Sequence, residues 1–187
     1  MQITLEKAGE LVRKYLQDKN NQLHSRESEV VLRALAKELG EDEEVWALSG
    51  LLHDLDWEQI VDNYQDHGLK IITLLKEEGY EVPIEASQAI SAHNEKYTGT
   101  KRQSKLDYAL AAGESVTGLI YAYALMRPEK LEGMKASSLN KKFKDEKFAA
   151  NIQRELIFDI EKAGIEKSKF FEIAIQAMQD IASEIGF

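Results

Sequence analysis

Apolar residues recur every three or four positions along most of the chain, the spacing of one face of an α-helix. The pattern predicts a first helix over residues 4–18 and a second over 25–39, which we expect Asn20 and Asn21 to separate. Further helices are predicted over residues 42–55, 67–78, 83–93, 104–126, 145–163 and 168–185, with a loop at 94–102 and a short turn at 136–140. No alternating strand pattern stands out, so we predict an all-α fold, a compact bundle of about seven to nine helices.

Chain length and the positions of helix breakers set the expected domain organisation. The chain has 187 residues, the size of one ordinary domain, and only two prolines interrupt it. We therefore predict a single helical domain over residues 1–187. Within it, residues 1–20 form an N-terminal helix and residues 141–187 a C-terminal helical extension.

Charge and cysteine content narrow the chemistry. There are 24 Lys and Arg residues against 33 Asp and Glu, a formal net charge of −9. This acidity argues against binding of long nucleic acid, but a bound metal would still allow a small phosphorylated substrate. Cysteine is absent, so a transition-metal site has to use His, Asp and Glu. The charged, amphipathic start MQITLEKAGELVRKYL predicts no signal peptide and no membrane association, and we expect a cytoplasmic protein, monomeric or homodimeric.

The four histidines carry the main functional signal. His24, His53, His67 and His93 all fall at predicted helix ends, where side chains of different helices can converge on one point. Asp54 follows His53 in the apolar context LLHDLD, and burying both groups is costly unless they are paired or metal-bound. Imidazole nitrogen with carboxylate oxygen suits Mn, Fe, Co, Ni or Zn. The pattern favours a metal site; the alternative is a set of ordinary core and surface histidines.

Longer motifs resemble the HD superfamily of metal-dependent phosphohydrolases, in particular a small, single-domain HDIG-like subgroup. The resemblance begins with HSRESEVVLRALAKELGEDEEVWALSGLLHDLDWE and continues through DHGLKIITLLKEEG and AISAHNEKY. It extends through SKLDYALAAGESVTGLIYAYALMRPEK and KFKDEKFAANIQRELI, so it spans nearly the whole chain. The resemblance implies an enzyme that hydrolyses a small phosphoester, with nucleotides among the candidates, by means of a metal-activated water.

The same resemblance implies a set of metal ligands. They are His24, His53, Asp54 and a later acid, which falls on Glu114 where the family has aspartate. Glutamate is one methylene longer, so Asp107 on the same predicted helix is kept as an alternative. Binuclear members place extra ligands where His67 and His93 stand. We favour one divalent ion (Mn, Fe, Co, Ni, Zn or Mg), with His67 and His93 beside it as catalytic residues.

Several other residues are candidates for the reaction. Asp54 is expected to orient the nucleophile as well as bind metal, and Asp56 is a candidate acid, base or supporting residue. The expected phosphate-binding cations are Lys96, Arg102 and Arg127, with Arg26 and Lys101 as weaker candidates. Trp57 and Tyr97 have the chemistry to stack on a base, although we expect them to pack in the core.

Two other functions stay open at the level of the sequence. The substitution of Glu114 for aspartate would suit a catalytically weak nucleotide-binding or sensor protein. Alternatively, the apolar stretch 106–126 and the C-terminal helices would form a dimer face in an interaction module without a site.

Overall fold

The computed structural model describes residues 1–60 and 63–187, and the predicted all-α class is confirmed. Its α-helices are α1 (Leu5–Tyr15), α2 (Lys19–Leu39), α3 (Glu43–Leu52), α4 (Leu69–Glu77), α5 (Ile84–His93), α6 (Glu95–Thr98), α7 (Lys105–Met126), α8 (Ala136–Phe143), α9 (Arg154–Phe158) and α10 (Lys167–Asp180). Short 3₁₀ helices occupy Trp57–Gln59, Tyr64–Asp66 and Asp159–Ala163. The described part therefore holds more helices than the seven to nine predicted. Two of them, α6 and α9, are short helices that the apolar pattern did not mark as separate elements.

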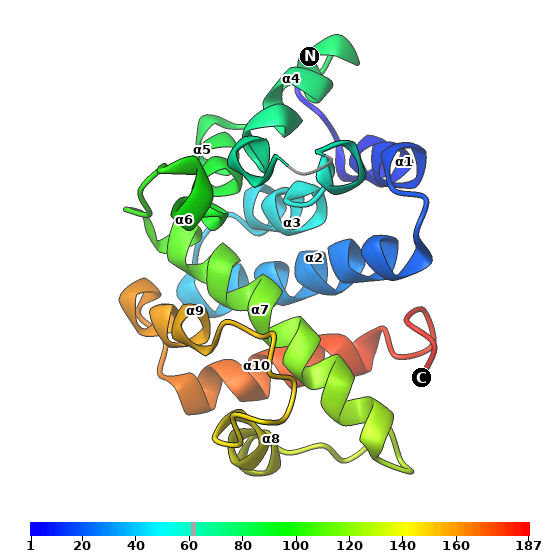
Figure 1. Ribbon diagram of the computed structural model, residues 1–187, viewed down its shortest axis with the longest axis vertical. Helices are drawn as coiled ribbons and strands as arrows, with labels where there is room; N and C mark the ends of the chain where they lie inside the picture. Colours follow the sequence, from blue (N-terminus) through cyan, green and yellow to red (C-terminus); the bar gives the residue numbers. More distant parts are fainter. Residues whose placement is uncertain (61–62) are drawn as a thin grey trace.

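Helix α2 lies at the centre of the bundle. It packs against α3 on one side and against α7 and α10 on the other, and Figure 1 shows the long α7 crossing it obliquely. Glycines allow two of these contacts to be close. A Cβ atom on Gly50 of α3 would lie 2.5 Å from the Ser28 carbonyl oxygen of α2, and one on Gly113 of α7 would lie 2.5 Å from a Leu32 methyl. The backbones of three helices therefore approach one another near His24, His53 and Glu114.

The boundary predicted between the first two helices is wrong by six residues. Helix α2 begins at Lys19 because the Asp18 side chain accepts a hydrogen bond from the Asn20 amide, 2.8 Å away, and caps the first turn. Asn20 and Asn21 are therefore inside the helix. His24 consequently lies in the second turn of α2, and its ring position is fixed by a formed helix.

The predicted helix over 145–163 is also wrong. Helix α8 extends to Phe143, and the chain then turns irregularly until α9 begins at Arg154. The Arg154 guanidinium donates to five backbone carbonyls, those of Phe143, Asp145, Phe148, Ala149 and Ile152. One side chain thus satisfies backbone acceptors that a helix would have satisfied internally, and it folds residues 144–153 into a loop.

Helix α7 is long and apolar enough to cross a membrane by length and composition alone. Most of its apolar stretch, 61%, is buried inside the fold, as for a core helix. Its apolar character is therefore used in packing against α2, α5 and α9. In the described structure, this covers most of the stretch that we considered as a dimer face.

Candidate metal centre

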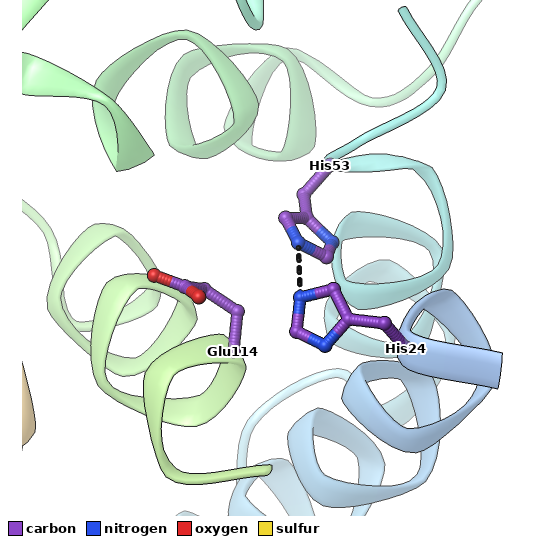
Figure 2. Close-up of side chains that lie close together, drawn as sticks. All are labelled: His24, His53 and Glu114. Carbon is purple, nitrogen blue, oxygen red and sulfur yellow. Dashed lines mark hydrogen bonds between the residues drawn. The ribbon is translucent and has the colours of Figure 1, made fainter. Parts of the chain in front are cut away.

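His24 and His53 are brought together from α2 and the end of α3. Their Nε2 atoms lie 3.3 Å apart, as the dashed line in Figure 2 shows. The close contact of Gly50 with Ser28 sets this distance, because His53 follows Gly50 by three residues and His24 precedes Ser28 by four. Each pair lies on one helix face or its direct continuation. Packing between two helices thus places both imidazoles at one point.

The hydrogen bonds of the histidines show which ring nitrogen is available for a metal. Nδ1 of His53 lies 2.8 Å from the Gly50 carbonyl oxygen, and Nδ1 of His93 lies 2.6 Å from that of Ile90. A carbonyl only accepts, so both Nδ1 atoms carry a proton. Nδ1 of His24 lies 3.2 Å from the Thr117 hydroxyl oxygen, which itself donates to the Glu114 carbonyl.

A second cluster forms beside the first one. His67 Nε2 and His93 Nε2 lie 3.1 Å apart, and His67 Nδ1 lies 2.8 Å from Asp56 Oδ1. As in the first cluster, Nδ1 has a protein acceptor and Nε2 points toward the other ligands. This arrangement is typical of metal-binding histidines, whose second nitrogen donates to an oxygen of the protein.

Asp54 connects the two clusters. Its Oδ2 lies 3.4 Å from His53 Nε2 and 3.7 Å from His24 Nε2. Its Oδ1 lies 3.2 Å from His67 Nε2 and 3.8 Å from His93 Nε2. One carboxylate therefore presents one oxygen to each pair of histidines, and it could contribute a ligand atom to an ion held at either pair.

Glu114 completes the first cluster from the side of α7, across from the two imidazoles (Figure 2). Ligand atoms of His24, His53 and Glu114 lie within 4.8 Å of one another, and so do those of Asp54, His67 and His93. Each group of three can hold one metal ion. The mixture of imidazole nitrogen and carboxylate oxygen fits a divalent transition metal in both places.

Electrostatics keep the ligand atoms in the form that a metal requires. Burial lowers the pKa of His24 to about 4, and His53 adds to the effect. Burial and the neighbouring His67 lower the pKa of His93 to about 3. Burial disfavours the charged form of Asp54, but His53 and His67 outweigh it and hold its pKa well below the usual value. Near pH 7, His24 and His93 are neutral and Asp54 is a carboxylate.

His67 and Glu114 differ from these ligands in their protonation. Burial lowers the pKa of His67, but hydrogen bonds with Asp54 and Asp56 outweigh it and raise the pKa to about 9. A proton on His67 thus sits where positive charge is favoured between the two carboxylates. Burial raises the pKa of Glu114 to about 7, against the opposing effect of His53. A divalent ion would replace these protons with its own charge.

Two of the predicted acids have supporting positions. Asp56 is fully buried behind His67; its Oδ2 also accepts a hydrogen bond from the Gly68 amide, 2.8 Å away. It therefore orients His67 and does not face a substrate, which corrects its assignment as a catalytic acid or base. Asp107 forms the capping box of α7 with Ser104 and accepts from the Gln103 amide, so its role there is to cap the helix.

The predicted phosphate-binding cations divide into two kinds. Lys96 and Arg102 line the cavity in front of Asp54, but the Arg102 guanidinium donates 3.2 Å to the His93 carbonyl and lies 3.6 Å from Glu95 and Asp159. Arg102 thus holds the end of α5, whereas Lys96 lines the cavity with its Nζ 5.3 Å from the centre of the Tyr97 ring. The assignment of Arg127 is wrong.

Arg127 lies thirteen residues beyond Glu114 along α7, about 20 Å away at 1.5 Å per residue. Its guanidinium donates to the carbonyls of Lys130 and Glu132 and stabilises the turn after the helix. The weaker candidates are also engaged elsewhere. Arg26 pairs with Glu29 and Glu184, and Lys101 pairs with Glu95.

The cavity in front of the metal-binding residues has a volume of about 360 Å³. Its lining includes Tyr64, Asn94, Gln153 and Leu156, none of which was predicted from the sequence. Gln153 lies at the end of the loop 144–153, and Leu156 lies in α9. Both were missed because a continuous helix was predicted over 145–163. Glu114 and Gln153 also border a smaller cavity, which opens beside His24. The metal-binding residues are therefore reached from two sides.

An all-helical fold with a cluster of His, Asp and Glu side chains where several helices meet defines a class of helical metal-binding domains. The family model described as HD domain matches residues 23–163, well over half of the chain, and the chain belongs to this family. The predicted superfamily is thereby confirmed, while the HDIG-like subgroup stays a prediction. No curated protein and no solved structure shows a significant match. HD domains are in general metal-dependent hydrolases, and the matched span includes every histidine.

Proposed function

We propose that this protein is a metal-dependent phosphohydrolase that acts on a small phosphoester. The observation that carries the proposal is the orientation of the four imidazoles. Each Nδ1 lies within hydrogen-bonding distance of a protein oxygen, and each Nε2 points toward Asp54 and a neighbouring Nε2. Imidazole nitrogens that converge in pairs beside one carboxylate are typical of side chains that would hold divalent metal ions.

The geometry favours two divalent ions, whereas the sequence alone favoured one. His24, His53 and Glu114 would hold the first ion, His67 and His93 the second, and Asp54 would bridge them. A pair of divalent ions supplies a nucleophilic water at neutral pH and stabilises charge on the phosphoryl oxygens. The metal identity stays open among Mn, Fe, Co, Ni, Zn and Mg.

The residues of the chain have distinct roles in this proposal. Asp54 fixes the spacing of the two clusters and orients the attacking water. His67 and His93, which we first expected beside the ion as catalytic groups, act as ligands. Lys96 lines the cavity and binds a phosphate oxygen. Asp56 and Arg102 hold His67 and the end of α5 in place.

The direct experiment measures bound metal and phosphatase activity together. Wild type, His53→Ala and Asp54→Ala are compared with Asp180→Ala, which removes an exposed carboxylate on α10. We expect metal and hydrolysis of p-nitrophenyl phosphate in wild type and the control, and a loss of both in the two site variants. Equal activity in all four proteins would refute the proposal.

A second candidate function is a nucleotide-binding sensor without turnover. Glu114 favours it, because its Oε1 accepts a hydrogen bond from the Ser115 hydroxyl at 2.8 Å and its pKa is raised to about 7 by burial. A protonated carboxyl is a poor ligand, so the first ion would be weakly held. Nucleotide binding without product across several metals, and a sharp gain of activity in Glu114→Asp, would favour this alternative. Cytoplasmic location and the absence of membrane or long nucleic acid partners stay predictions.

A further inference from the structure

The two cavities beside the metal-binding residues reach different ligands. The larger one is lined by the residues of the second cluster, Asp54, His67 and His93. The smaller one is lined by His24 of the first cluster, and Glu114 borders both cavities. The His24 side chain is 26% exposed, whereas that of His53 is 1% exposed. Solvent therefore reaches His24 through the smaller cavity, without passing the second cluster.

The two cavities differ in the charges that line them. Lys96 and Arg102 line the larger one. Among the described residues that line the smaller one there is no lysine or arginine, and Ser115 and Asn151 offer hydroxyl and amide oxygens beside Glu114. Such oxygens suit hard divalent cations, which the positive charge at the larger cavity repels. The smaller cavity therefore favours a cation, and the larger one an anion.

Aromatic rings make a further difference between the cavities. Trp57, Tyr64 and Tyr97 line the larger one, with exposed fractions of 41%, 49% and 47%. Core packing, which we expected for Trp57 and Tyr97, is therefore wrong. Lys96 Nζ lies 5.3 Å from the centre of the Tyr97 ring, so a cation already occupies this ring. The rings give the larger cavity a surface for an organic molecule, whereas the smaller one is lined mainly by polar groups.

The size of the smaller cavity fits a metal ion with its water. Its volume is about 180 Å³. A water molecule takes about 30 Å³, so roughly six waters, or one ion with its inner hydration shell, fill it. Gly118 of α7 and Ile152 of the loop 144–153 face each other here, because a Cβ atom on Gly118 would lie 3.0 Å from Ile152 Cδ1. A longer side chain at position 118 would narrow the cavity.

From these differences we propose that the smaller cavity is an entry site for hydrated divalent cations, which pass from it to His24 and Glu114, while the phosphorylated substrate uses the larger cavity. Each cavity then takes the charge that its lining favours. Gly118 keeps the entry site open, because it has no side chain to meet Ile152. This inference rests on the proposed function, because it names the route by which the same metal centre is filled.

A side chain at Gly118 tests the route by narrowing it. Metal-free protein is mixed with Co²⁺, and the visible absorption of the bound ion is followed by stopped flow. We expect Gly118→Leu to load Co²⁺ at least roughly tenfold more slowly, because the loop 144–153 has to move before the ion enters. Its Kd should stay near that of wild type, since a narrowed passage slows entry and release alike. Gly118→Ala, which adds only the Cβ atom, should load at an intermediate rate.

A pair of added charges keeps the test valid if Gly118→Leu does not fold. Asn151 is exposed at the smaller cavity, and Tyr97 is exposed at the larger one. Asn151→Lys should slow Co²⁺ loading roughly tenfold at low salt, the lower end of the range for electrostatic steering, and less at high salt. Tyr97→Lys, the matched charge at the other cavity, should load at close to the wild-type rate. Wild-type loading in Gly118→Leu or in Asn151→Lys would overturn the entry site, and so would slower loading in Tyr97→Lys than in Asn151→Lys.

Loading and hydrolysis are separate readouts, so the two proposals can fail separately. Co²⁺ that binds and supports hydrolysis, but loads all variants at one rate, would overturn the entry site and retain the hydrolase. Slower loading in Gly118→Leu and Asn151→Lys, without hydrolysis by any of the proteins, would support the entry site and refute the hydrolase. Failure of wild type to bind Co²⁺, Mn²⁺ or Zn²⁺ at equilibrium would refute both.

Discussion

At the scale of the residue, Glu114 decides how the first cluster works. It stands within 4.8 Å of ligand atoms of His24 and His53, but its longer side chain also hydrogen-bonds Ser115. Burial raises its pKa to about 7, and a metal ion would favour the charged form. The fit of glutamate in this place therefore depends on a cation.

Replacing Glu114 by glutamine tests this dependence with little change of shape. We expect Glu114→Gln to bind Mn²⁺ at least roughly tenfold more weakly, as for the loss of an important metal contact. Its melting temperature without metal should be equal to or above that of wild type, because a buried acid has been removed. Metal titration and thermal unfolding measure both quantities. Glu161→Gln, on an exposed position, is the control, and unchanged Mn²⁺ affinity in Glu114→Gln would show that the acid does not ligate.

Glu27 on α2 is a buried acid that the proposed chemistry does not use. It is 3% exposed, and its Oε1 has no hydrogen-bond partner among the described residues. Burial raises its pKa to about 8. In the folded protein it is therefore protonated at a pH where it is ionised in the unfolded chain.

This shift predicts how stability changes with pH. Folding takes up a proton at Glu27 when the pH lies between 4.5 and about 8. The contribution of protonated Glu27 to the free energy of unfolding is therefore complete below pH 4.5 and is lost as the pH rises to about 8. Within this window, each rise of one pH unit lowers the free energy of unfolding by about 1.4 kcal/mol. Urea unfolding at pH 5, 6.5 and 8 should show Glu27→Gln gaining on wild type as the pH rises. Glu38→Gln, on an exposed position, is the control, and a difference between Glu27→Gln and wild type that stays the same at all three pH values would contradict the prediction.

At the scale of the element, the close contact of α2 and α3 positions two ligands. Gly50→Ala would place a methyl group 2.5 Å from the Ser28 carbonyl oxygen, and a backbone atom cannot rotate away. We expect a loss of about 1–3 kcal/mol in the free energy of unfolding, the range for overpacking. Metal affinity should fall too, because His24 and His53 move apart.

A second glycine provides the matched control. Gly9 lies on α1, where a Cβ atom would meet only the end of the Arg13 side chain at 3.6 Å. Gly9→Ala should therefore raise stability by up to about 1 kcal/mol through helix propensity. Urea unfolding of both variants measures the difference, and equal stability of Gly50→Ala and wild type would argue against the close contact.

Elements differ in how well the sequence predicts them. Helices α5 and α7 were predicted nearly to their ends, because Pro83 precedes one and Ser104 caps the other. The segment 145–163 has helical apolar spacing, but residues 145–153 fold as a loop, because Arg154 binds their carbonyls, and helix begins only at Arg154. Local pattern cannot predict such a side chain, which reaches back across eleven residues to Phe143.

At the scale of the whole molecule, the metal centre joins residues that are far apart in the chain. His24 and Glu114 are ninety positions apart, and the six ligands come from α2, the turn that follows α3, the end of the 3₁₀ helix before α4, α5 and α7. The unfolded chain has no such site. Metal binding is therefore expected to stabilise the folded state by mass action.

Removal of metal should lower the melting temperature. At a free Mn²⁺ concentration about a hundredfold above Kd, the stabilisation is about 2.7 kcal/mol. For a chain of this size, this corresponds to roughly 5–10 °C. Thermal unfolding with Mn²⁺ and with EDTA measures the shift, which should vanish in Asp54→Ala. A melting temperature that is indifferent to Mn²⁺, Ni²⁺ and Zn²⁺ in wild type would contradict the prediction.

The sequence by itself determined the all-α class, the HD family and the set of histidines and acids around His53 and Asp54. It did so because helical periodicity and short motifs are local properties of the chain. Only the tertiary structure decided that Asp54 lies between two clusters, that Asp56 supports His67, and that Arg127 is remote. It also brought Trp57, Tyr64 and Tyr97 to one cavity. The physical reason is that periodicity fixes which face of a helix is apolar, whereas close contacts between helices, such as that of Gly50 with Ser28, fix which faces meet.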